Sequence, residues 1–548
     1  MRIALGQFDA HVGDLAGNVE KMRSMYEQAV KQNVDLLVFP ELAVCGYPPE
    51  DLLIKRHFIE DNLLAVEKLA KSCPDITIVV GYPGLLDGRI YNCAAVLKNG
   101  KIEDVYRKGL LPNFGVFDEQ RYFKAGDEPV MINIKGVNVA ITICLDIWDS
   151  NWLKDFLADC NPIHMILNIS ASPFHVGKIQ KRLSAITQCA QKFNAALCYC
   201  NNVGGQDELI FDGRSAIADS TGKIRCLAGA FEEELLIADL NLSGENNLDI
   251  QQVSPVSSQP AGDIEEVYKA LVLGTRDYTR KNGFKKILLG VSGGIDSALV
   301  TSIAVAALGP ENVIGITMPT RFNSAETISD ATKLAENLGI EFYNIAIEKI
   351  VQQFHSSLKS IPGWDDKGTA YENLQARIRG TLLMSLSNQF GALVLTSGNK
   401  SETAVGYATL YGDTAGGFAV IKDIPKTLVY KLAEFVNSTR EKPVIPKDIL
   451  TRPPTAELRE DQKDTDSLPD YDMLDEILKG YVEQDKSAKQ LIESSFPKEV
   501  VRKVITLVDR NEYKRRQSPP GIKITPKAFG KDRRLPITNR YCSFNNEP

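Results

Sequence analysis

The sequence predicts an α/β protein with two domains, and three observations carry that prediction. At 548 residues the chain is longer than one hydrophobic core normally serves. Short apolar segments alternate with amphipathic helical patterns over roughly residues 1–240, and a strand–helix–strand order resumes after about Asp263. The stretch between is rich in Ser, Asn, Gln and Pro, which is typical of a linker. We therefore expect one domain over 1–243, a linker over 244–262 and a second domain over 263–548.

In the first domain, apolar segments predict buried strands at 2–8, 34–40, 76–82, 92–98, 137–144, 164–170, 195–201 and 215–220. Helical patterns lie between several of them, for example at 18–33 and 58–72. Much of the sheet is expected to be buried.

Composition excludes several classes of protein. No apolar run reaches membrane-spanning length, and the amino terminus lacks the features of a secretory signal. The ten cysteines are scattered, several within apolar runs, which favours buried thiols in a reducing compartment. The five histidines show no metal-ligand spacing, and a net charge of −7 argues against a general nucleic-acid binder. We expect a cytoplasmic enzyme whose catalytic base is not a histidine.

Three strand ends in the first domain predict an amide-cleaving site. Glu41 follows the segment LLVFP, Lys108 follows another strand with Glu119 a short loop further on, and Cys144 ends the segment AITIC. Singly, such residues usually serve a turn, the surface or packing, but together they can meet at one edge of the sheet. Glu41 would take the thiol proton, Cys144 would attack an amide carbon, and Lys108 would stabilise the oxyanion. Cys45, a competing thiol in a Gly- and Pro-containing loop, is interpreted as packing.

The second domain is predicted to be a doubly wound parallel sheet. A helix at 264–282 precedes a strand at 285–292, and helices at 297–308 and 325–339 alternate with strands at 312–319 and 341–347. In such a sheet, ligands bind at the carboxyl ends of the strands.

The motif Ser-Gly-Gly-Ile-Asp-Ser at 292–297 lies directly between a strand and a helix, where backbone N–H groups converge on an anion. Gly293 and Gly294 allow close approach to phosphate oxygens, and Asp296 can hold a magnesium ion. There is no Walker A lysine. The loop resembles that of ATP pyrophosphatases, which adenylylate an acid and release pyrophosphate. The residues expected to bind ATP are Gly290, Val291, Ser292, Gly293, Gly294, Ile295, Asp296 and Ser297.

Later segments agree with this prediction. Ser397 to Glu402 follows the buried segment GALVLT, where a second nucleotide-facing loop would lie, and Glu402 is a candidate second magnesium ligand. The segment ENLQARIRG, which contains Asn373, predicts a helix whose polar residues are either functional or simply solvated. From Arg510 the chain is rich in Lys, Arg and Pro, which predicts either a solvated tail or a strap closing on an anionic substrate.

With these motifs, nearly the whole chain resembles the bacterial glutamine-dependent NAD synthetases. Glu41, Lys108 and Cys144 match the three catalytic motifs of the nitrilase superfamily, and SGGIDS, YENLQARIRG, SGNKSE and YGDTAGGF match NAD synthetases. The resemblance implies a nitrilase-like αββα sandwich followed by a Rossmann-like domain of the adenine nucleotide alpha hydrolase type. It also implies that glutamine-derived ammonia crosses a tunnel and amidates deamido-NAD(+) after adenylylation by ATP. Mg²⁺ and a homo-oligomer built on a synthetase-domain dimer are implied as well.

Further site residues are implied only by this resemblance. Ser172, Lys178 and the position of Phe114 would contact glutamine, Ser397 would face ATP, and Asn373, Glu402 and Lys514 would contact deamido-NAD(+). Three positions depart from the family pattern: Phe114 replaces Tyr, Leu145 follows the nucleophile where Glu is frequent, and Ser397 replaces Thr.

Two kinds of alternative stay open at this point. The same loop serves GMP synthesis, asparagine synthesis and tRNA thiolation, although scarce histidine and the absence of cysteine pairs near the loop speak against the first and third. The second kind of alternative is a catalytically inactive nucleotide sensor, although a sensor would have no need of a nucleophile beside a base.

Overall fold

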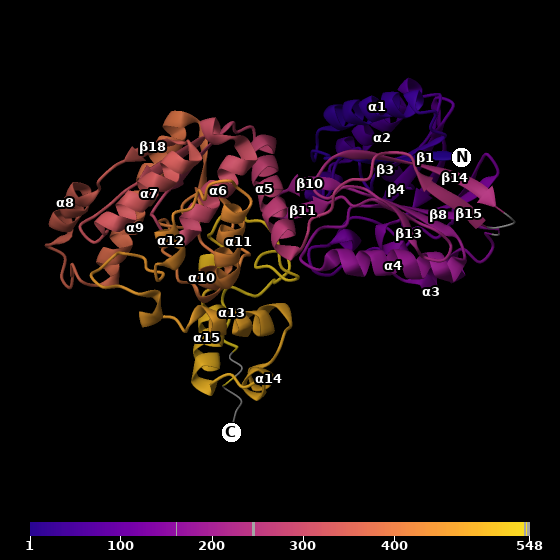
Figure 1. The fold of residues 1–548 in the computed structure, drawn as a ribbon. Coiled ribbons are helices and arrows are strands. Elements are labelled where there is room, and N and C mark those ends of the chain that lie inside the picture. The colour runs from indigo at the N-terminus through magenta and orange to yellow at the C-terminus, as the bar shows by residue number, and fades with distance from the viewer. Residues whose placement is uncertain (161, 244–246, 542–543, 545–548) are drawn as a thin grey trace. The chain divides into compact units, whose positions relative to one another are not determined.

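The computed structural model describes residues 1–160, 162–243, 247–541 and 544. The chain divides into two compact units, Met1–Ala261 and Gly262–Pro548, each with its own core (Figure 1). No helix in the described part of the chain is both long and apolar enough to cross a membrane.

The first unit contains two mixed sheets. One has the order β15 (Asn247–Gln252), β14 (Glu234–Ser243), β1 (Arg2–Gln7), β2 (Leu36–Val38), β3 (Thr77–Leu86), β4 (Arg89–Lys98) and β5 (Lys101–Arg107). The other has the order β13 (Ile224–Leu227), β12 (Ala216–Ala218), β9 (Ala196–Asn201), β8 (Met165–Ser170), β7 (Val137–Ile143) and β6 (Met131–Ile134). Strands β1, β2 and β3 are parallel at the centre of the first sheet, as are β7, β8 and β9 in the second. A hairpin of β10 (Val203–Gln206) and β11 (Leu209–Asp212) stands apart from both.

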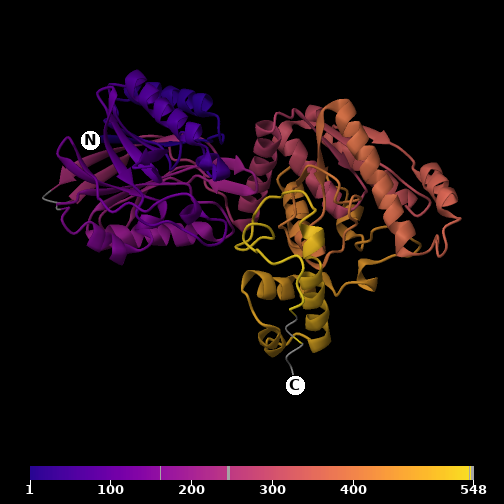
Figure 2. The ribbon, with the colours of Figure 1, turned by 180° about the vertical axis from the view of Figure 1, so that it is seen from behind.

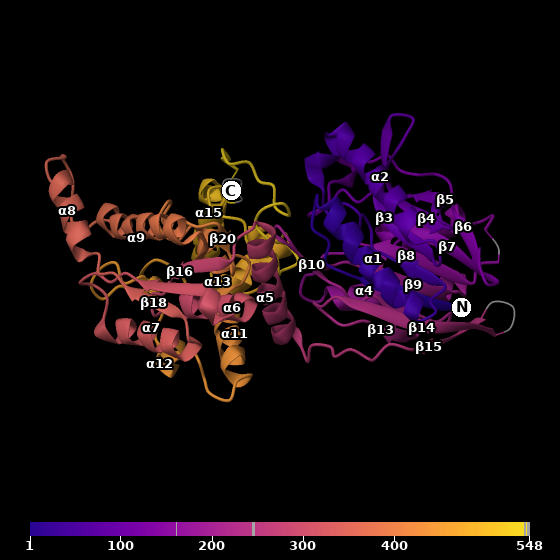
Figure 3. The same cartoon turned by 90° about the horizontal axis from the view of Figure 1, so that it is seen from above.

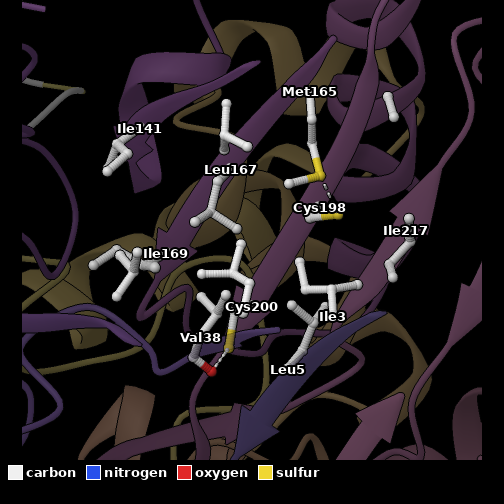
Figure 4. Packing of buried hydrophobic residues seen from close by; sticks show 14 of the residues in the cluster. Ile3, Leu5, Val38, Ile141, Met165, Leu167, Ile169, Cys198, Cys200 and Ile217 are labelled. Carbon is white, nitrogen blue, oxygen red and sulfur yellow. Dashed lines mark hydrogen bonds between the residues drawn. The ribbon is translucent and has the colours of Figure 1, made fainter. Parts of the chain in front are cut away.

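The two sheets pack face to face because alternate side chains of each strand point into a shared core. Ile3 and Leu5 of β1 lie in one cluster with Ile141, Leu167 and Cys198 of the facing sheet (Figure 4). The intervening residue of β1, Ala4, instead packs in the cluster with α1 (Leu15–Lys31) and α2 (Arg56–Ser72). The other outer face is covered by α3 (Ser150–Phe156) and α4 (Lys178–Phe193). The layers are therefore helix, sheet, sheet and helix, as the family resemblance implies.

Part of the segment expected to be a linker is a strand. β15 pairs antiparallel with β14, with Leu248 opposite Leu242 and Ile250 opposite Leu240. Leu248 is buried and contributes to the shared core. The prediction of a linker was wrong over β15. An edge strand needs an apolar residue only at every second position, so the strand was not recognised in a segment of mostly polar composition. Residues 244–246 of the expected linker lie outside the described residues.

The second unit is built on a parallel sheet with the order β18 (Glu341–Asn344), β17 (Val313–Thr317), β16 (Lys286–Gly290), β19 (Ala392–Thr396) and β20 (Phe418–Ala419). Figure 3 shows α6 (Ile295–Leu308) and α7 (Ala325–Leu338) on one side of the sheet and α9 (Thr369–Phe390) on the other. α5 (Asp263–Lys281) packs on α6, and α8 (Glu348–Leu358) packs on α9. This is the predicted doubly wound arrangement.

A helical region begins after β19, before the short edge strand β20, and carries a separate apolar cluster. Its helices are α10 (Lys400–Val405), α11 (Lys426–Ser438), α12 (Lys447–Thr451), α13 (Tyr471–Leu478), α14 (Ala488–Glu493), α15 (Lys498–Arg510) and α16 (Glu512–Arg515), with a π-helical turn at Lys479–Glu483. Short 3₁₀ turns lie at η1 (Glu50–Ile54), η2 (Glu119–Arg121), η3 (Cys144–Ile147), η4 (Pro310–Asn312) and η5 (Asp464–Asp466).

The basic segment after Arg510 packs against this unit, which excludes the solvated-tail alternative as far as residue 533 (Figure 2). The backbone N–H groups of Ile524 and Thr525 donate to the carboxylate of Asp423. Lys523 is buried and pairs with Asp532. The positive charges of this segment are therefore partly neutralised within the protein rather than displayed to solvent.

Candidate active sites

Glu41, Lys108 and Glu119 meet in a buried charged cluster at the strand ends of the first unit. The ammonium of Lys108 lies 2.6 Å from Oε1 of Glu41 and 2.8 Å from Oε2 of Glu119. The hydroxyl of Tyr47 donates to the other oxygen of Glu119 at 2.9 Å. One cation thus joins two carboxylates in a region that water hardly reaches. Of the three strand-end residues expected to meet, Glu41 and Lys108 are in direct contact, and Glu119 joins them from the following loop.

The position of Glu41 depends on contacts that the sequence did not predict. The Nδ2 amide of Asn92 donates to Oε1 of Glu41 at 2.7 Å, and the backbone N–H of Ala171 donates to Oε2 at 2.9 Å. A glycine in β3 makes room for the backbone around Glu41, because a Cβ added at Gly81 would lie 2.3 Å from the amide nitrogen of Leu42. The Glu41 carboxylate is therefore fixed by three donors from three different parts of the chain.

Cys144 is the first residue of η3 and has a backbone φ of +46°. A left-handed conformation is uncommon outside glycine, and such residues cluster at functional sites. The residue is buried at the end of β7. Burial and the charge of Glu41 raise the pKa of its thiol, while Lys108 acts in the opposite direction. The three charged groups are thus close enough to influence the sulfur, and the thiol is held protonated beside a carboxylate.

Electrostatics inside the cluster favour a charged lysine. Burial acts to lower the pKa of Lys108, but the charges of Glu119 and Glu41 outweigh it and the net shift is upward. Burial raises the pKa of Glu119 to about 7, with Lys108 opposing that rise. Lys108 is therefore a permanent positive charge, whereas Glu119 can change its charge near neutral pH.

Of the three residues expected to contact glutamine, Ser172 and Lys178 lie in the region of the charged cluster, whereas Phe114 faces solvent. Ser172 is buried and its carbonyl accepts from the guanidinium of Arg182. Lys178 begins α4, with its ammonium 4.5 Å from the centre of the Trp148 ring. Burial lowers the pKa of Lys178 to about 8, aided by Arg182, while Cys144 opposes it. Phe114 is 60% exposed and packs edge-on against Phe117, so its ring does not form a buried wall.

The glycine loop of the second unit lies between β16 and α6, where the sequence places it. The Ser292 backbone N–H donates to the Ser297 hydroxyl, which in turn bonds the Gly294 carbonyl. Gly293 has a φ of +82°, and a Cβ there would lie 2.3 Å from the carbonyl oxygen of Thr327. Only glycine meets both requirements, so the loop is a tightly closed turn.

A cavity of about 310 Å³ opens in front of this loop. Seven of the eight residues expected to bind ATP in the loop line it, together with Ser397 and Glu402; the eighth, Ser297, braces the loop from behind. The cavity wall also contains Arg379, one of the polar residues of the segment ENLQARIRG, and residues that sequence reasoning missed, among them Lys426, Arg452, Glu457 and Asp464.

Asp296 and Glu402 approach one another in this cavity, and Lys426 lies between them. The Lys426 ammonium contacts Oδ2 of Asp296 and lies 3.6 Å from Oε1 of Glu402, while the Asn399 amide donates to Oδ1 of Asp296 at 2.9 Å. Burial and the charge of Asp296 raise the pKa of Glu402 to about 8, with Lys426 opposing. The two predicted metal ligands are thus brought together. Lys426 carried no signal in the sequence, since a lysine following Pro is usually a surface residue.

The remaining expected residues meet around the loop after α10. The Thr409 hydroxyl donates to Oδ1 of Asn373 at 2.7 Å. The Lys514 ammonium donates to the carbonyls of Gly406 and Ala408 at 2.8 and 2.9 Å. Asn373, from α9, and Lys514, from α16, therefore hold the same loop from two sides.

Comparison with known proteins covers both units. A family model described as carbon-nitrogen hydrolase matches residues 2–247, and one described as NAD synthase matches residues 267–518. The glutamine-dependent NAD(+) synthetase of Thermotoga maritima is 45% identical over 572 residues, covering 99% of both proteins. The chain belongs to the glutamine-dependent NAD(+) synthetase family. The synthetase of Acinetobacter baylyi is similarly related, at 46% identity over 98% of both proteins.

Solved structures of the same family agree over the full length. The glutamine-dependent NAD+ synthetase from Acinetobacter baumannii in complex with adenosine diphosphate has a TM-score of 0.78 and 43% identity, covering 98% of each chain. The synthetase from Cytophaga hutchinsonii has a TM-score of 0.83 at 25% identity, covering 100% of this chain and 98% of the other. The resemblance stated from the motifs is confirmed.

Proposed function

We propose that this glutamine-dependent NAD(+) synthetase converts deamido-NAD(+), ATP, glutamine and water to NAD(+), AMP, pyrophosphate and glutamate. The observation that carries the proposal is the pairing of two sites on one chain. One is the buried Glu41–Lys108–Glu119 cluster beside Cys144, and the other is the glycine-loop cavity with Asp296. A full-length match to the family supports joining them in one reaction.

In the proposed glutaminase step, Glu41 accepts the thiol proton of Cys144 as the sulfur bonds to the amide carbon of glutamine. The oxyanion that forms is neutralised by the Lys108 ammonium, which Glu41 and Glu119 hold in place. Glu41 then protonates the leaving nitrogen, so that ammonia departs and a thioester remains on Cys144. A water molecule deprotonated by Glu41 hydrolyses the thioester to glutamate, and the proton returns to the thiol.

Ser172 and Lys178 are proposed to bind the amino-acid end of glutamine. The lowered pKa of Lys178 indicates an ammonium partly deprived of water, which a substrate carboxylate would stabilise. Phe114 lies at an exposed position, and its contribution is proposed to be limited to the rim of the site.

In the proposed synthetase step, the nicotinate carboxylate of deamido-NAD(+) attacks the α-phosphorus of ATP and pyrophosphate leaves. Ammonia then attacks the activated carbonyl and AMP leaves. Gly290 to Ser297 and Ser397 are proposed to hold ATP, with backbone N–H groups of the loop facing the phosphates. Asn373, Glu402 and Lys514 are proposed to bind deamido-NAD(+), and transfer of ammonia from the first site is part of the same proposal.

The residues fit a magnesium ion, although no set of three His, Cys, Asp or Glu side chains within the described residues is arranged to hold a metal by itself. Magnesium usually takes one or two carboxylates and completes its shell with substrate phosphates and water. Asp296 and Glu402 supply two such carboxylates, and burial together with the charge of Asp296 raises the pKa of Glu402 even though Lys426 lies beside it. When bound there, the ion would neutralise phosphate charge as pyrophosphate leaves.

Homo-oligomer formation through the synthetase unit is also proposed, by analogy with the family. Exposed apolar side chains on α8 and α9, Phe354 and Met384, support it. Sedimentation velocity tests it, because a Phe354→Glu, Met384→Glu double variant should then sediment as a smaller species than the parent.

Two substitutions test the assignment of the two sites. Cys144→Ala should abolish synthesis with glutamine and leave synthesis with ammonium chloride largely intact. Asp296→Ala should abolish both. AMP and NAD(+) are measured with each nitrogen source in turn. Glutamine-dependent synthesis that survives Cys144→Ala contradicts the glutaminase site, and wild-type protein that forms no AMP with ammonia contradicts the function.

A further inference from the structure

A third buried carboxylate, that of Asp146, lies close to the glutaminase cluster, and its hydrogen bonds among the described residues come from Tyr106, Leu110 and Ile143 rather than from the cluster itself. Asp146 is fully buried in η3, two residues after Cys144. The chemistry proposed for the site has no use for it as a base, since Glu41 already serves that role. A buried carboxylate needs donors, and the identity of those donors shows what it does.

The donors to Asp146 come from both chain segments that carry the reaction. Its Oδ2 accepts the backbone N–H of Ile143, the residue before the nucleophile, at 2.8 Å. Its Oδ1 accepts the backbone N–H of Leu110, two residues after Lys108, at 2.9 Å. Oδ2 also accepts the hydroxyl of Tyr106, two residues before Lys108, at 2.8 Å.

These bonds enclose the two reactive residues. Tyr106 lies on β5 and Leu110 follows its end, so that the pair fixes the backbone on both sides of Lys108. The bond to Ile143 closes the first turn of η3, in which Cys144 has its left-handed backbone. β5 and β7 belong to different sheets, so no ladder of backbone hydrogen bonds fixes one segment relative to the other.

We infer that Asp146 is a positioning residue that fixes the Lys108 ammonium relative to the Cys144 sulfur. The inference rests on the proposed glutaminase function and adds a residue to it. Alignment matters because an ammonium stabilises the oxyanion only if it faces the oxygen that develops charge. A displacement of about 1 Å can lower a rate about 100-fold.

The test uses the full-length protein with the isosteric variant Asp146→Asn. The amide retains one oxygen acceptor but points an N–H at groups that are themselves donors. We expect the kcat for glutamine hydrolysis to fall about 100-fold while the KM for glutamine stays within about threefold. Ammonium-dependent NAD(+) synthesis should be unchanged, since it uses the other unit.

Alkylation of Cys144 by iodoacetamide separates positioning from a general loss of structure. This displacement forms no oxyanion, so it needs the thiol and Glu41 but not an aligned Lys108. We expect its rate, followed by mass spectrometry at Cys144, to stay within about threefold of wild type in Asp146→Asn. If the rates of glutamine hydrolysis and of alkylation fell together in Asp146→Asn, the turn at Cys144 would be disordered and the inference overturned. An unchanged kcat for glutamine hydrolysis would also overturn it.

Two further variants keep the test decisive. Tyr106→Phe removes one hydrogen-bond donor and leaves the Asp146 carboxylate in place, so we expect kcat to fall about fivefold with an unchanged KM. If Asp146→Asn does not fold, Tyr106→Phe decides alone. An unchanged kcat in Tyr106→Phe would then overturn the inference. Asp149→Asn is the matched control, because the side chain of Asp149 caps α3 through the N–H groups of Asn151 and Trp152. Its kcat should match wild type. If Cys144→Ala hydrolysed glutamine as fast as the wild type, the proposed glutaminase function itself would be contradicted.

Discussion

The ammonium of Lys108 bonds Oε1 of Glu41 at 2.6 Å, and the same oxygen accepts the side-chain amide of Asn92 at 2.7 Å. The other oxygen, Oε2, accepts only the N–H of Ala171 among the bonds of the described residues. A carboxylate oxygen can accept two hydrogen bonds, so Oε2 still has a lone pair that can take a proton from a thiol. The proposed base, Glu41, and the proposed oxyanion-binding cation, Lys108, are thus hydrogen-bonded to each other through Oε1. The lone pair available for the thiol proton lies on Oε2 of Glu41.

Glu119 should set the acid limit of glutamine hydrolysis. Its pKa, raised by burial to about 7, means that it loses its charge as the pH falls below neutrality. Lys108 would then be held by Glu41 alone, and a tighter pair makes Glu41 a poorer base. We expect kcat for glutamine hydrolysis to fall below about pH 7, and Glu119→Gln to lower it about tenfold to 100-fold at all pH values.

Ammonium-dependent synthesis is the internal control for that experiment, because it should keep its own pH profile in the variant. An acid limb near pH 7 that persists in Glu119→Gln would assign the titration to another group.

The sequence predicted the positions of Glu41, Cys144 and the glycine loop because buried parallel strands read as continuous apolar runs. Each run ends where its strand ends, and the functional residue follows directly. The prediction of α1, α2, α6 and α7 succeeded for a related reason, since each packs an apolar face or side on a sheet.

Residues that act through distant contacts carried no such signal. Asn92, Asp146 and Lys426 are polar residues whose partners are 51, 36 and 130 positions away, respectively, in chain order. No local period encodes such a pairing. The edge strands β6, β13 and β15 were missed because an edge strand can be half polar and short, and β15 was mistaken for linker.

Lys178 should make glutamine binding depend on pH in the opposite direction. Burial lowers its pKa to about 8, so the ammonium form is lost as the pH rises above that value. If the ammonium binds the substrate carboxylate, the KM for glutamine rises above pH 8 with a limiting slope of about tenfold per pH unit. Lys178→Met should show a high KM without this slope, whereas Lys181→Met, at an exposed neighbouring position, should retain it.

Lys400 should be needed for the stability of the second unit rather than for its chemistry. Its ammonium is buried, 2.9 Å from Asp423 and 2.7 Å from Glu483, and it joins α10 to the segment after Pro520 through Thr525. Lys400→Met leaves the buried Asp423 and the partly buried Glu483 short of a partner, so we expect the free energy of unfolding to fall by about 3–5 kcal/mol.

The matched control is Lys527→Met, which breaks an ion pair with the exposed Asp485. Such pairs contribute about 1 kcal/mol or less. Denaturant unfolding of the two variants compares them directly, and equal losses of stability would contradict the role of burial.

Binding of magnesium and ATP should release a proton from Glu402. Its pKa of about 8, raised by burial and by the charge of Asp296, leaves the carboxyl largely protonated at pH 7. A carboxyl group ligates a metal ion only after deprotonation, so the release of about one proton is expected at pH 7 and little above pH 9. Calorimetric titration with magnesium and ATP in two buffers of different ionisation enthalpy measures it. Because ATP itself exchanges protons, Glu402→Gln is titrated in parallel, and the release assigned to Glu402 is the difference between the proteins. A difference of zero at pH 7 would show that Glu402 does not ligate the ion, whichever group supplies the remaining protons.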